Sequence, residues 1–379
     1  MSTFIERFTV PDLPAGSPVV RVAIKDLIDV AGTITTAGCR AVAEQATPAP
    51  TDAPLLAGTR AAEARGEVQI VGKVNLHELA FGSTGVNPWY GTPPNPLGPD
   101  LVPGGSSSGS AAAVANGDAD VAFGTDTGGS VRIPSACCGT AGLKTTFGRI
   151  DTTGVWPLAR SLDTVGPMAR DIAGLVVGMQ LLEPGFAVDV APAVHVGRVR
   201  IVDVDPIVDA AVDDALRRAG FHITEVEDPG WVGLWGPGFR ILVREAWEDD
   251  HHLLDRRDLV SPDIASLLDL GAALTPEEVA AARREQDAWR AQLLELFESF
   301  DVLALPAMPV LPPARGDDHT AQLASLMVAA NLAGVPALAQ PIPTTGALPA
   351  SLQLLAPHDG EALLLATGQV VEDATRTNA

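Results

Sequence analysis

The sequence predicts an α/β fold in a single domain, with a β-sheet covered on both faces by helices. Short apolar strands alternate with helical patterns, and the strands are almost continuously apolar, which is typical of a sheet buried on both sides. The chain has 379 residues, of which 46% are apolar, so it can bury a substantial core. Two or three domains would also fit this length, and residues 184–192 have the composition of a linker. Because nothing repeats along the chain, we favour one domain over residues 1–379.

The strands are expected where β-branched and other apolar residues cluster, at Val19–Ile24, Val68–Val71, Val121–Phe123, Val199–Val202 and Val302–Leu305. The helices are expected between them, from a cap at Asp52 to about Gly66, and over Asp171–Leu182, Thr275–Phe300 and Glu361–Glu372. The third helix has the clearest start, because Thr275 as N-cap and Glu278 form a capping box.

The charge of the chain excludes several classes of partner. The formal net charge is −22, from 25 basic and 47 acidic residues, and such a surface repels nucleic acids and anionic lipid. No apolar run has the length of a membrane span, and the first ten residues lack the pattern of a signal peptide. We therefore expect a cytoplasmic protein without nucleic-acid or membrane partners.

Neither a disulfide framework nor a metal site is indicated. Cys137 and Cys138 are adjacent and Cys39 is remote from them, and no Cys/His spacing resembles that of a metal site. His251 and His252 follow an acidic run, which favours a solvated helix face. We expect no metal and no cofactor.

Lysine is rare, and this restricts the candidates for a base. Only Lys25, Lys73 and Lys144 are lysines among the 25 basic residues. Arginine stays protonated, whereas a desolvated lysine can lose its proton near neutral pH. These three residues are therefore the candidate bases. The alternative for each is that the lysine has no catalytic role and is present by chance.

Two glycine-rich stretches, residues 82–110 and 124–135, interrupt the alternation of strands and helices. Phosphate binding is one interpretation, but neither stretch has the pattern of a P-loop or of a dinucleotide-binding loop. Tight structural turns are another. A formal Gly-x-Ser-x-Gly match centred on Ser107 lacks the preceding strand that a nucleophile elbow needs.

Nucleophilic catalysis is the third interpretation. Ser130 follows consecutive glycines, and the backbone N–H groups of Thr127, Gly128, Gly129 and Ser130 could stabilise an oxyanion. No Ser-His-Asp arrangement is evident, and a Ser–Lys pair is a recognised substitute. Lys25 and Lys73 both end predicted strands, so spacing alone does not select between them.

At these residues the chain resembles the amidase signature family. Ser106 and Ser130 stand 24 residues apart, as the paired serines of that family do. Matching motifs then follow in order, at Val131-Arg132-Ile133-Pro134-Ser135, Cys138-Gly139, Gly142-Leu143-Lys144, Gly148-Arg149 and Ser161-Leu162-Asp163-Thr164-Val165-Gly166-Pro167. Further matches lie upstream, at Ile24-Lys25-Asp26 and Gly72-Lys73-Val74-Asn75 with Glu78, and downstream, at Asn331–Pro336 and Ser351–Leu354.

The resemblance implies the amidase signature fold, with a mixed β-sheet, and a Ser–cis-Ser–Lys triad. Ser130 would attack the amide carbonyl to form an acyl-enzyme that water then hydrolyses. Ser106 would relay the proton and be joined to Gly105 by a cis peptide bond. The family pattern assigns the base to the position of Lys25, which leaves Lys73 and Lys144 in structural roles.

The resemblance covers a core of about residues 19–172 and 301–373, and residues 175–300 carry little of it. In this family that middle segment usually shapes the substrate pocket. Trp89, Tyr90 and Trp156 lie near the motif loops and are candidates for an apolar or aromatic acyl pocket, although core packing is an equal alternative. Gly105 is a further candidate for substrate binding. Asp126 and Arg132 flank the nucleophile and are expected to brace its loop.

Three functions are compatible with these residues. The first is an amidase that converts a small-molecule carboxamide to a carboxylate and ammonia or an amine, as a possible homodimer. The second is an amidotransferase-type subunit that hydrolyses glutamine for a partner. The third is a non-catalytic binding protein, which the intact Ser130, Ser106 and Lys25 argue against.

Overall fold

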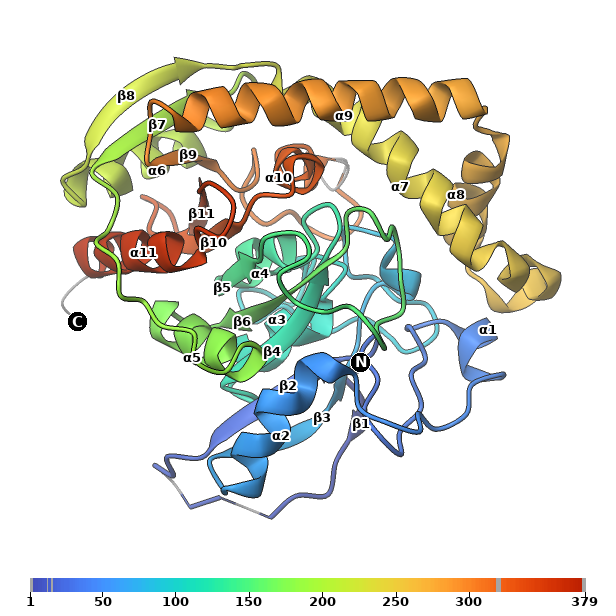
Figure 1. Cartoon of the computed structure of the whole chain (residues 1–379). Helices are drawn as coiled ribbons and strands as arrows, with labels where there is room; N and C mark the ends of the chain where they lie inside the picture. The colour runs from blue at the N-terminus through green and yellow to red at the C-terminus, as the bar shows by residue number, and fades with distance from the viewer. Residues whose placement is uncertain (1–2, 12, 15, 318–321, 377–379) are drawn as a thin grey trace.

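One mixed β-sheet runs through the computed structural model, which describes residues 3–11, 13–14, 16–317 and 322–376 (Figure 1). Its strands lie in the order β1 (Phe4–Arg7), β3 (Val68–Val74), β2 (Val20–Lys25), β4 (Val121–Asp126), β6 (Thr164–Ala169), β5 (Ala141–Lys144), β10 (Ala337–Ile342), β11 (Ala350–Leu355), β9 (Val302–Pro306), β7 (His195–Arg200) and β8 (His222–Glu227). β2 and β7 are each parallel to both of their neighbours, whereas the remaining pairs are antiparallel, which confirms the mixed sheet.

Four of the five predicted strands are confirmed, with small changes at their ends. The prediction at Val199–Val202 is wrong in position, because β7 begins at His195 and ends at Arg200. The chain turns just beyond, where Asp203 has a φ of 59° and Val202 is 68% exposed. β5 and β6 were also not predicted, because their glycine and proline residues are more typical of loops.

The helices follow their capping residues closely. Asp171 caps α5 (Ile172–Leu182), and the predicted capping box begins α9 (Pro276–Phe297). The C-terminal helix α11 (Glu361–Thr375) runs three residues beyond its predicted end. Asp52 does not cap a helix: α2 (Ala57–Ala64) follows a short 3-10 turn, and the Asp52 carboxylate pairs instead with Arg60. The other α-helices are α1 (Arg40–Ala43), α3 (Ser108–Ala115), α4 (Arg132–Cys138), α6 (Pro206–Arg218), α7 (Trp235–Asp250), α8 (Pro262–Ala273) and α10 (Val328–Ala333).

Helices lie on both faces of the sheet. Alternate side chains along β2 point to opposite faces and therefore pack against different helices. Val22 and Ile24 pack with α2 on one face, whereas Ala23 packs with α3 on the other. Lys25 is two residues beyond Ala23, so it also points toward the α3 face. This register brings the lysine to the side of the sheet where the glycine-rich loops lie.

The segment between the two parts of the core contributes β7 and β8 to the sheet and is otherwise mainly helical. In it α7 packs against both α8 and α9, and these helices share an apolar cluster with α10 (Figure 1). None of the helices in the described chain is long and apolar enough to cross a membrane. Nor do the described residues contain a group of three or more His, Cys, Asp or Glu side chains suited to holding a metal ion.

Candidate active site

Lys25 and Ser106 are in direct contact beneath the first glycine-rich loop. The Lys25 Nζ donates hydrogen bonds to Ser106 Oγ and to Thr125 Oγ1, both at 2.7 Å. All three side chains are buried, and burial lowers the pKa of Lys25 to about 7. A lysine with this pKa is partly neutral at pH 7, so its nitrogen can accept a proton from the serine.

Gly105, which precedes Ser106, lies so close to the loop at residues 82–85 that no side chain would fit at this position. The peptide bond between Gly105 and Ser106 is cis, as the family resemblance implies. A Cβ on Gly105 would lie 2.7 Å from the carbonyl oxygen of Gly82 and from the amide nitrogen of Gly85. The Gly105 N–H donates to the Ser83 carbonyl at 2.7 Å. The loop that carries Ser106 is therefore fastened to the loop at residues 82–85.

Ser130 lies between the end of β4 and the start of α4. Its side chain is 8% exposed, and within the part of the chain that the structure describes its hydroxyl makes no hydrogen bond. The preceding Gly129 has a φ of +120°, and a Cβ there would lie 2.7 Å from the Met327 side chain. Glycine at this position lets the backbone turn so that the Ser130 side chain reaches a cavity.

A buried ion pair braces the loop around Ser130. Both side chains of the Asp126–Arg132 pair are fully buried, with nitrogen and oxygen 2.9 Å apart. Although burial alone would raise the pKa of Asp126, the Arg132 guanidinium holds it below its usual range. Arg132 also donates to the side-chain oxygens of Asn331 and Gln353. The pair therefore ties the loop to the C-terminal motifs, which is the bracing role expected from the sequence.

One predicted oxyanion donor is already occupied. The Gly129 N–H donates to Asp126 Oδ1 at 2.8 Å, so it does not face a substrate oxygen as the sequence suggested. The Asp126 carboxylate binds the Gly129 amide and so stabilises the turn. No backbone hydrogen bond is found for the N–H groups of Thr127, Gly128 and Ser130 among the described residues. Of these three residues, Gly128 and Ser130 line the cavity, whereas Thr127 is buried.

The other two lysines have different partners. Lys73 Nζ lies 2.6 Å from Asp26 Oδ1 in a fully buried ion pair and also donates to Thr35 Oγ1. Lys144 Nζ donates at 2.8 Å to the backbone carbonyls of Thr145 and Val335, and burial lowers its pKa to about 7. Of the three lysines, only Lys25 contacts a serine hydroxyl in the described chain.

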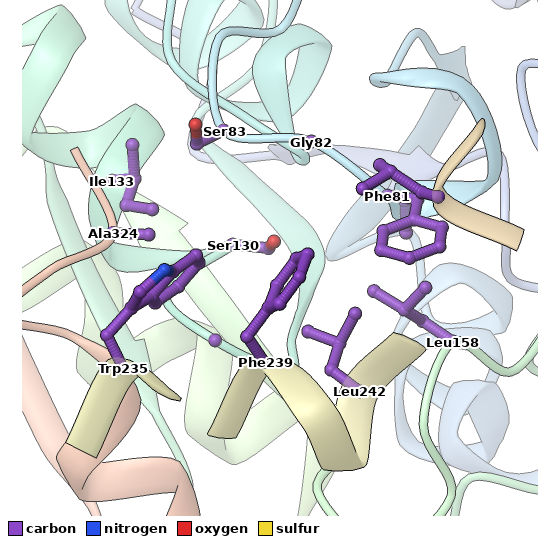
Figure 2. Close-up of a pocket in the computed structure, with 13 residues that line it drawn as sticks. Phe81, Gly82, Ser83, Ser130, Ile133, Leu158, Trp235, Phe239, Leu242 and Ala324 are labelled. Carbon is purple, nitrogen blue, oxygen red and sulfur yellow. The ribbon is translucent and has the colours of Figure 1, made fainter. Parts of the chain in front are cut away.

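An apolar cavity of about 180 Å³ opens beside Ser130 (Figure 2). Most of its wall comes from residues 80–83, from the loop of Ser130 and from α7. The lining residues are Ala80, Phe81, Gly82, Ser83, Gly128, Ser130, Ile133, Leu158, Trp235, Phe239, Leu242, Leu267 and Ala324. Among these residues none carries a charge. The Trp235 and Phe239 rings stack with their centroids 5.6 Å apart.

The predicted substrate-binding residues Trp89, Tyr90, Trp156 and Gly105 do not line this cavity. Two of the aromatic side chains are instead held elsewhere by acidic groups. Trp89 Nε1 donates to a carboxylate oxygen of Glu78 at 2.8 Å, and Trp156 Nε1 donates to Asp250 at 3.1 Å. A neighbouring position in sequence was therefore a poor guide to the pocket.

The sequence reasoning missed the aromatic residues that do form the wall. Phe81 directly precedes a glycine-rich stretch, which was an available indication. Trp235 and Phe239 are four residues apart on α7, so they share one helix face. That spacing is equally typical of a core-facing helix, and only the folded chain shows that this face borders Ser130.

Comparisons with known proteins agree with this geometry. The model of the Amidase family matches residues 19–195 and 201–365. A glutamyl-tRNA(Gln) amidotransferase subunit of Thermus thermophilus is 34% identical, over 96% of this chain and 86% of the relative. An indoleacetamide hydrolase of Pseudomonas syringae pv. syringae is 30% identical, over 93% of this chain and 84% of the relative.

The solved structures extend the agreement to the fold. The crystal structure of an amidase superposes with a TM-score of 0.85 at 30% identity and covers 94% of this chain and 85% of its own. A glutamyl-tRNA(Gln) amidotransferase subunit from Thermotoga maritima gives a TM-score of 0.84 at 25% identity, over 99% of this chain and 88% of its own. The chain therefore belongs to the amidase signature family and is an amide hydrolase.

Proposed function

We propose that Ser130 is the nucleophile, Ser106 the proton relay and Lys25 the base of this hydrolase. The observation that carries the proposal is the buried Lys25–Ser106 hydrogen bond, at 2.7 Å, close in the fold to a serine hydroxyl that faces an apolar cavity. A neutral lysine amine is a strong enough base to activate a serine through a second hydroxyl. The roles rest on this contact and on the order of the motifs.

In the first step Ser130 Oγ forms a bond to the amide carbon. Its proton passes to Ser106 Oγ while the Ser106 proton passes to the neutral Lys25 amine. As the C–N bond breaks, the same route returns a proton to the leaving nitrogen, which departs as ammonia or an amine. Water then adds to the acyl group by the same proton path and releases the carboxylate, so that every group returns to its starting state.

The amides of Thr127, Gly128 and Ser130 are the proposed oxyanion donors. Each is free of a backbone partner among the described residues, whereas Gly129 is bound to Asp126. A positioned donor of this kind stabilises the transition state by about 3 kcal/mol.

We propose an uncharged amide with an apolar or aromatic acyl group as the substrate. A dry engineered cavity of about 150 Å³ holds a benzene molecule. The cavity beside Ser130, at about 180 Å³, therefore has room for one aromatic ring or an aliphatic group of similar size. Among the relatives, the indoleacetamide hydrolase is one whose name specifies the amide of an aromatic acid.

Glutamine hydrolysis for a partner protein is the alternative, and the 34% identity to an amidotransferase subunit favours it. The described cavity wall argues against it, because the ammonium and carboxylate of glutamine would have no charged partner there. Ammonia release by the free chain from an arylacetamide and from glutamine separates the two. Turnover of the arylacetamide alone supports the proposal, and turnover of glutamine alone contradicts it.

Labelling with a fluorophosphonate tests the nucleophile directly. We expect one covalent adduct at Ser130, absent in Ser130→Ala and retained in Ser83→Ala, whose hydroxyl lines the same cavity. A folded wild-type chain that neither labels nor releases ammonia would favour the non-catalytic binding protein.

We also propose a cytoplasmic location and a homodimer. The net charge of −22 disfavours anionic partners, and two-fold dimers are the commonest oligomers. Cell fractionation and gel filtration of the full chain measure these two properties.

A further inference from the structure

One carboxylate, that of Asp163, joins the wall of the cavity to the nucleophile loop. Its Oδ1 accepts a hydrogen bond from Thr127 Oγ1 at 2.6 Å. Its Oδ2 accepts the backbone N–H of Leu158 at 3.0 Å, and the Ala159 N–H lies 3.2 Å from both oxygens. Asp163 immediately precedes β6, which pairs with β4, the strand that leads into the loop of Ser130.

The two sides of this contact have different tasks. Leu158 lines the cavity in which the acyl group would sit. Thr127 begins the turn whose amides would receive the oxyanion. Asp163 therefore links the cavity wall at Leu158 to the turn that begins at Thr127, whose next residue Gly128 also lines the cavity.

Asp163 also acts on Lys25 through its charge. Burial raises the pKa of Asp163 to about 6, so the carboxylate is still mostly ionised above pH 7. Its negative charge opposes the effect of burial on Lys25 and raises the pKa of that amine, as the charge of Asp126 also does. The acidic neighbours Glu245 and Asp250 and the basic Arg160 are the other charged groups coupled to Asp163.

We propose that Asp163 is a positioning residue, which sets the oxyanion loop against the cavity wall. The proposal rests on the function proposed above. It adds a residue that touches neither the substrate nor the nucleophile. Its hydrogen bonds act on kcat through Thr127, and its charge acts on the pH dependence through Lys25.

Thr127→Val and Thr127→Ser test the hydrogen-bonding part as a matched pair. Valine has the same shape without the hydroxyl, whereas serine keeps it. Because small displacements of catalytic groups cost up to about 10²-fold, we expect Thr127→Val to lower kcat about tenfold. KM should stay within about twofold, since the cavity is intact, and Thr127→Ser should recover most of the lost kcat. A Thr127→Val enzyme with wild-type kcat would overturn this part.

Asp163→Asn tests the charge. The asparagine oxygen cannot accept from both Thr127 and Leu158, so kcat should fall, again by about tenfold. Removing the negative charge should also lower the pKa of Lys25, so the acidic limb of kcat/KM should move to lower pH. A purely structural role would leave that limb in place, and an unmoved limb in a folded variant would overturn the electrostatic part.

The double variant closes the test. If Thr127 and Asp163 act through their contact, the losses in Thr127→Val/Asp163→Asn are less than additive, and full additivity contradicts the coupling. If Asp163→Asn does not fold, the threonine pair decides the outcome alone. Failure of the wild-type chain to label or to turn over would instead refute the proposed function, and this inference with it.

Discussion

The proposed catalytic centre and the cavity beside Ser130 lie side by side but come from different parts of the chain. Lys25, Ser106 and Ser130 are carried by β2, the first glycine-rich loop and the turn after β4. Trp235, Phe239 and Leu242 come from α7, in the segment at residues 175–300 that carries few of the motifs quoted above, although the family model also matches residues 201–365. On the proposed assignment, the chemistry lies in the core that carries the motifs, and α7 contributes to the selection of substrate.

The two regions also differ in how their residues are held. Around the nucleophile, buried ion pairs and backbone hydrogen bonds fix each group, as at Asp126 and Arg132. The cavity wall on α7 is formed by side-chain packing, which tolerates substitution by residues of similar volume. A family with one chemistry and many substrates is expected to divide its sequence in this way.

The largest effect that we predict comes from removing the proposed base. Lys25→Ala should lower kcat by about 10³-fold, within the range of general acid–base catalysis. Lys73→Ala breaks a buried ion pair with Asp26, so it should mainly destabilise the fold, by about 3–5 kcal/mol. Kinetics per folded molecule, combined with denaturant unfolding, separate these results.

Lys144→Ala is a useful control, because the pKa of this lysine is also lowered to about 7 but its nitrogen contacts only backbone carbonyls in the described chain. A loss of kcat in Lys144→Ala equal to that in Lys25→Ala would contradict the assignment of the base.

The pH dependence of the wild type follows from the same lysine. Below a pKa of about 7 the Lys25 amine is protonated and cannot accept a proton, so kcat/KM should fall as the pH drops through 7. It should reach a plateau above pH 8. A flat profile between pH 5 and 8 in a pH-rate titration would show that another group, or a lysine of ordinary pKa, governs the reaction.

Substitutions in the cavity should have smaller, substrate-dependent effects. Phe239→Ala removes an aromatic side chain from the cavity wall. Burying the ring of an arylacetamide against this side chain contributes about 1.5–3 kcal/mol to binding, so kcat/KM for that substrate should fall about ten- to hundredfold. For acetamide, which does not fill the cavity, the loss should be small. Equal losses with both substrates would show that Phe239 supports the catalytic centre rather than the choice of acyl group.

Trp89→Phe is the matched control for that experiment, because Trp89 was predicted to bind substrate but lies outside the cavity. Its kcat/KM should stay within about twofold of wild type, since most substitutions away from a site have small effects. A large loss of kcat/KM in Trp89→Phe would show that Trp89 does contribute to substrate binding.

The structure brings Lys25 and Ser106 together as expected from the sequence, but it places none of the expected aromatic residues in the cavity wall, and the reason is physical. Ser106 and Ser130 are marked by glycines that their own backbone requires, so the indication is local. The choice of Lys25 needed the family pattern, because strand register alone decides which lysine faces Ser106. The position of Trp235 beside Ser130 depends on how α7 crosses the core. No pattern within α7 contains that information.

The fold shows the same limit. Strands rich in β-branched residues, such as β2 and β3, were predicted, whereas β5 and β6 were missed because alanine, glycine and proline interrupt them. These short side chains are tolerated because neighbouring strands and helices approach closely: a Cβ on Gly166 would lie 1.9 Å from the Leu143 carbonyl oxygen. Tertiary packing, rather than local preference, makes these segments strands.

The smallest effect concerns the seam between the two regions, where the end of α7 meets the core. Asp250 is 1% exposed, one of its carboxyl oxygens has no hydrogen-bond partner among the described residues, and the other accepts from Trp156. Burial raises the pKa of this carboxyl to about 8. In the unfolded chain the group ionises near pH 3.9, so the folded state retains a proton between about pH 4 and 8 and loses stability as the pH rises through that window.

Asp250→Asn removes this proton linkage while keeping an oxygen for Trp156. The variant should therefore melt at nearly the wild-type temperature at pH 4 and about 5–7 °C above it at pH 8, as measured by calorimetry. Ammonia release from an arylacetamide should be unchanged, because Asp250 does not line the cavity. If the difference in Tm does not grow with pH, the carboxyl is ionised in the folded state. If kcat changes as well, the seam contributes to the active site, and the division between a catalytic core and a substrate-selecting segment is less sharp than the geometry indicates.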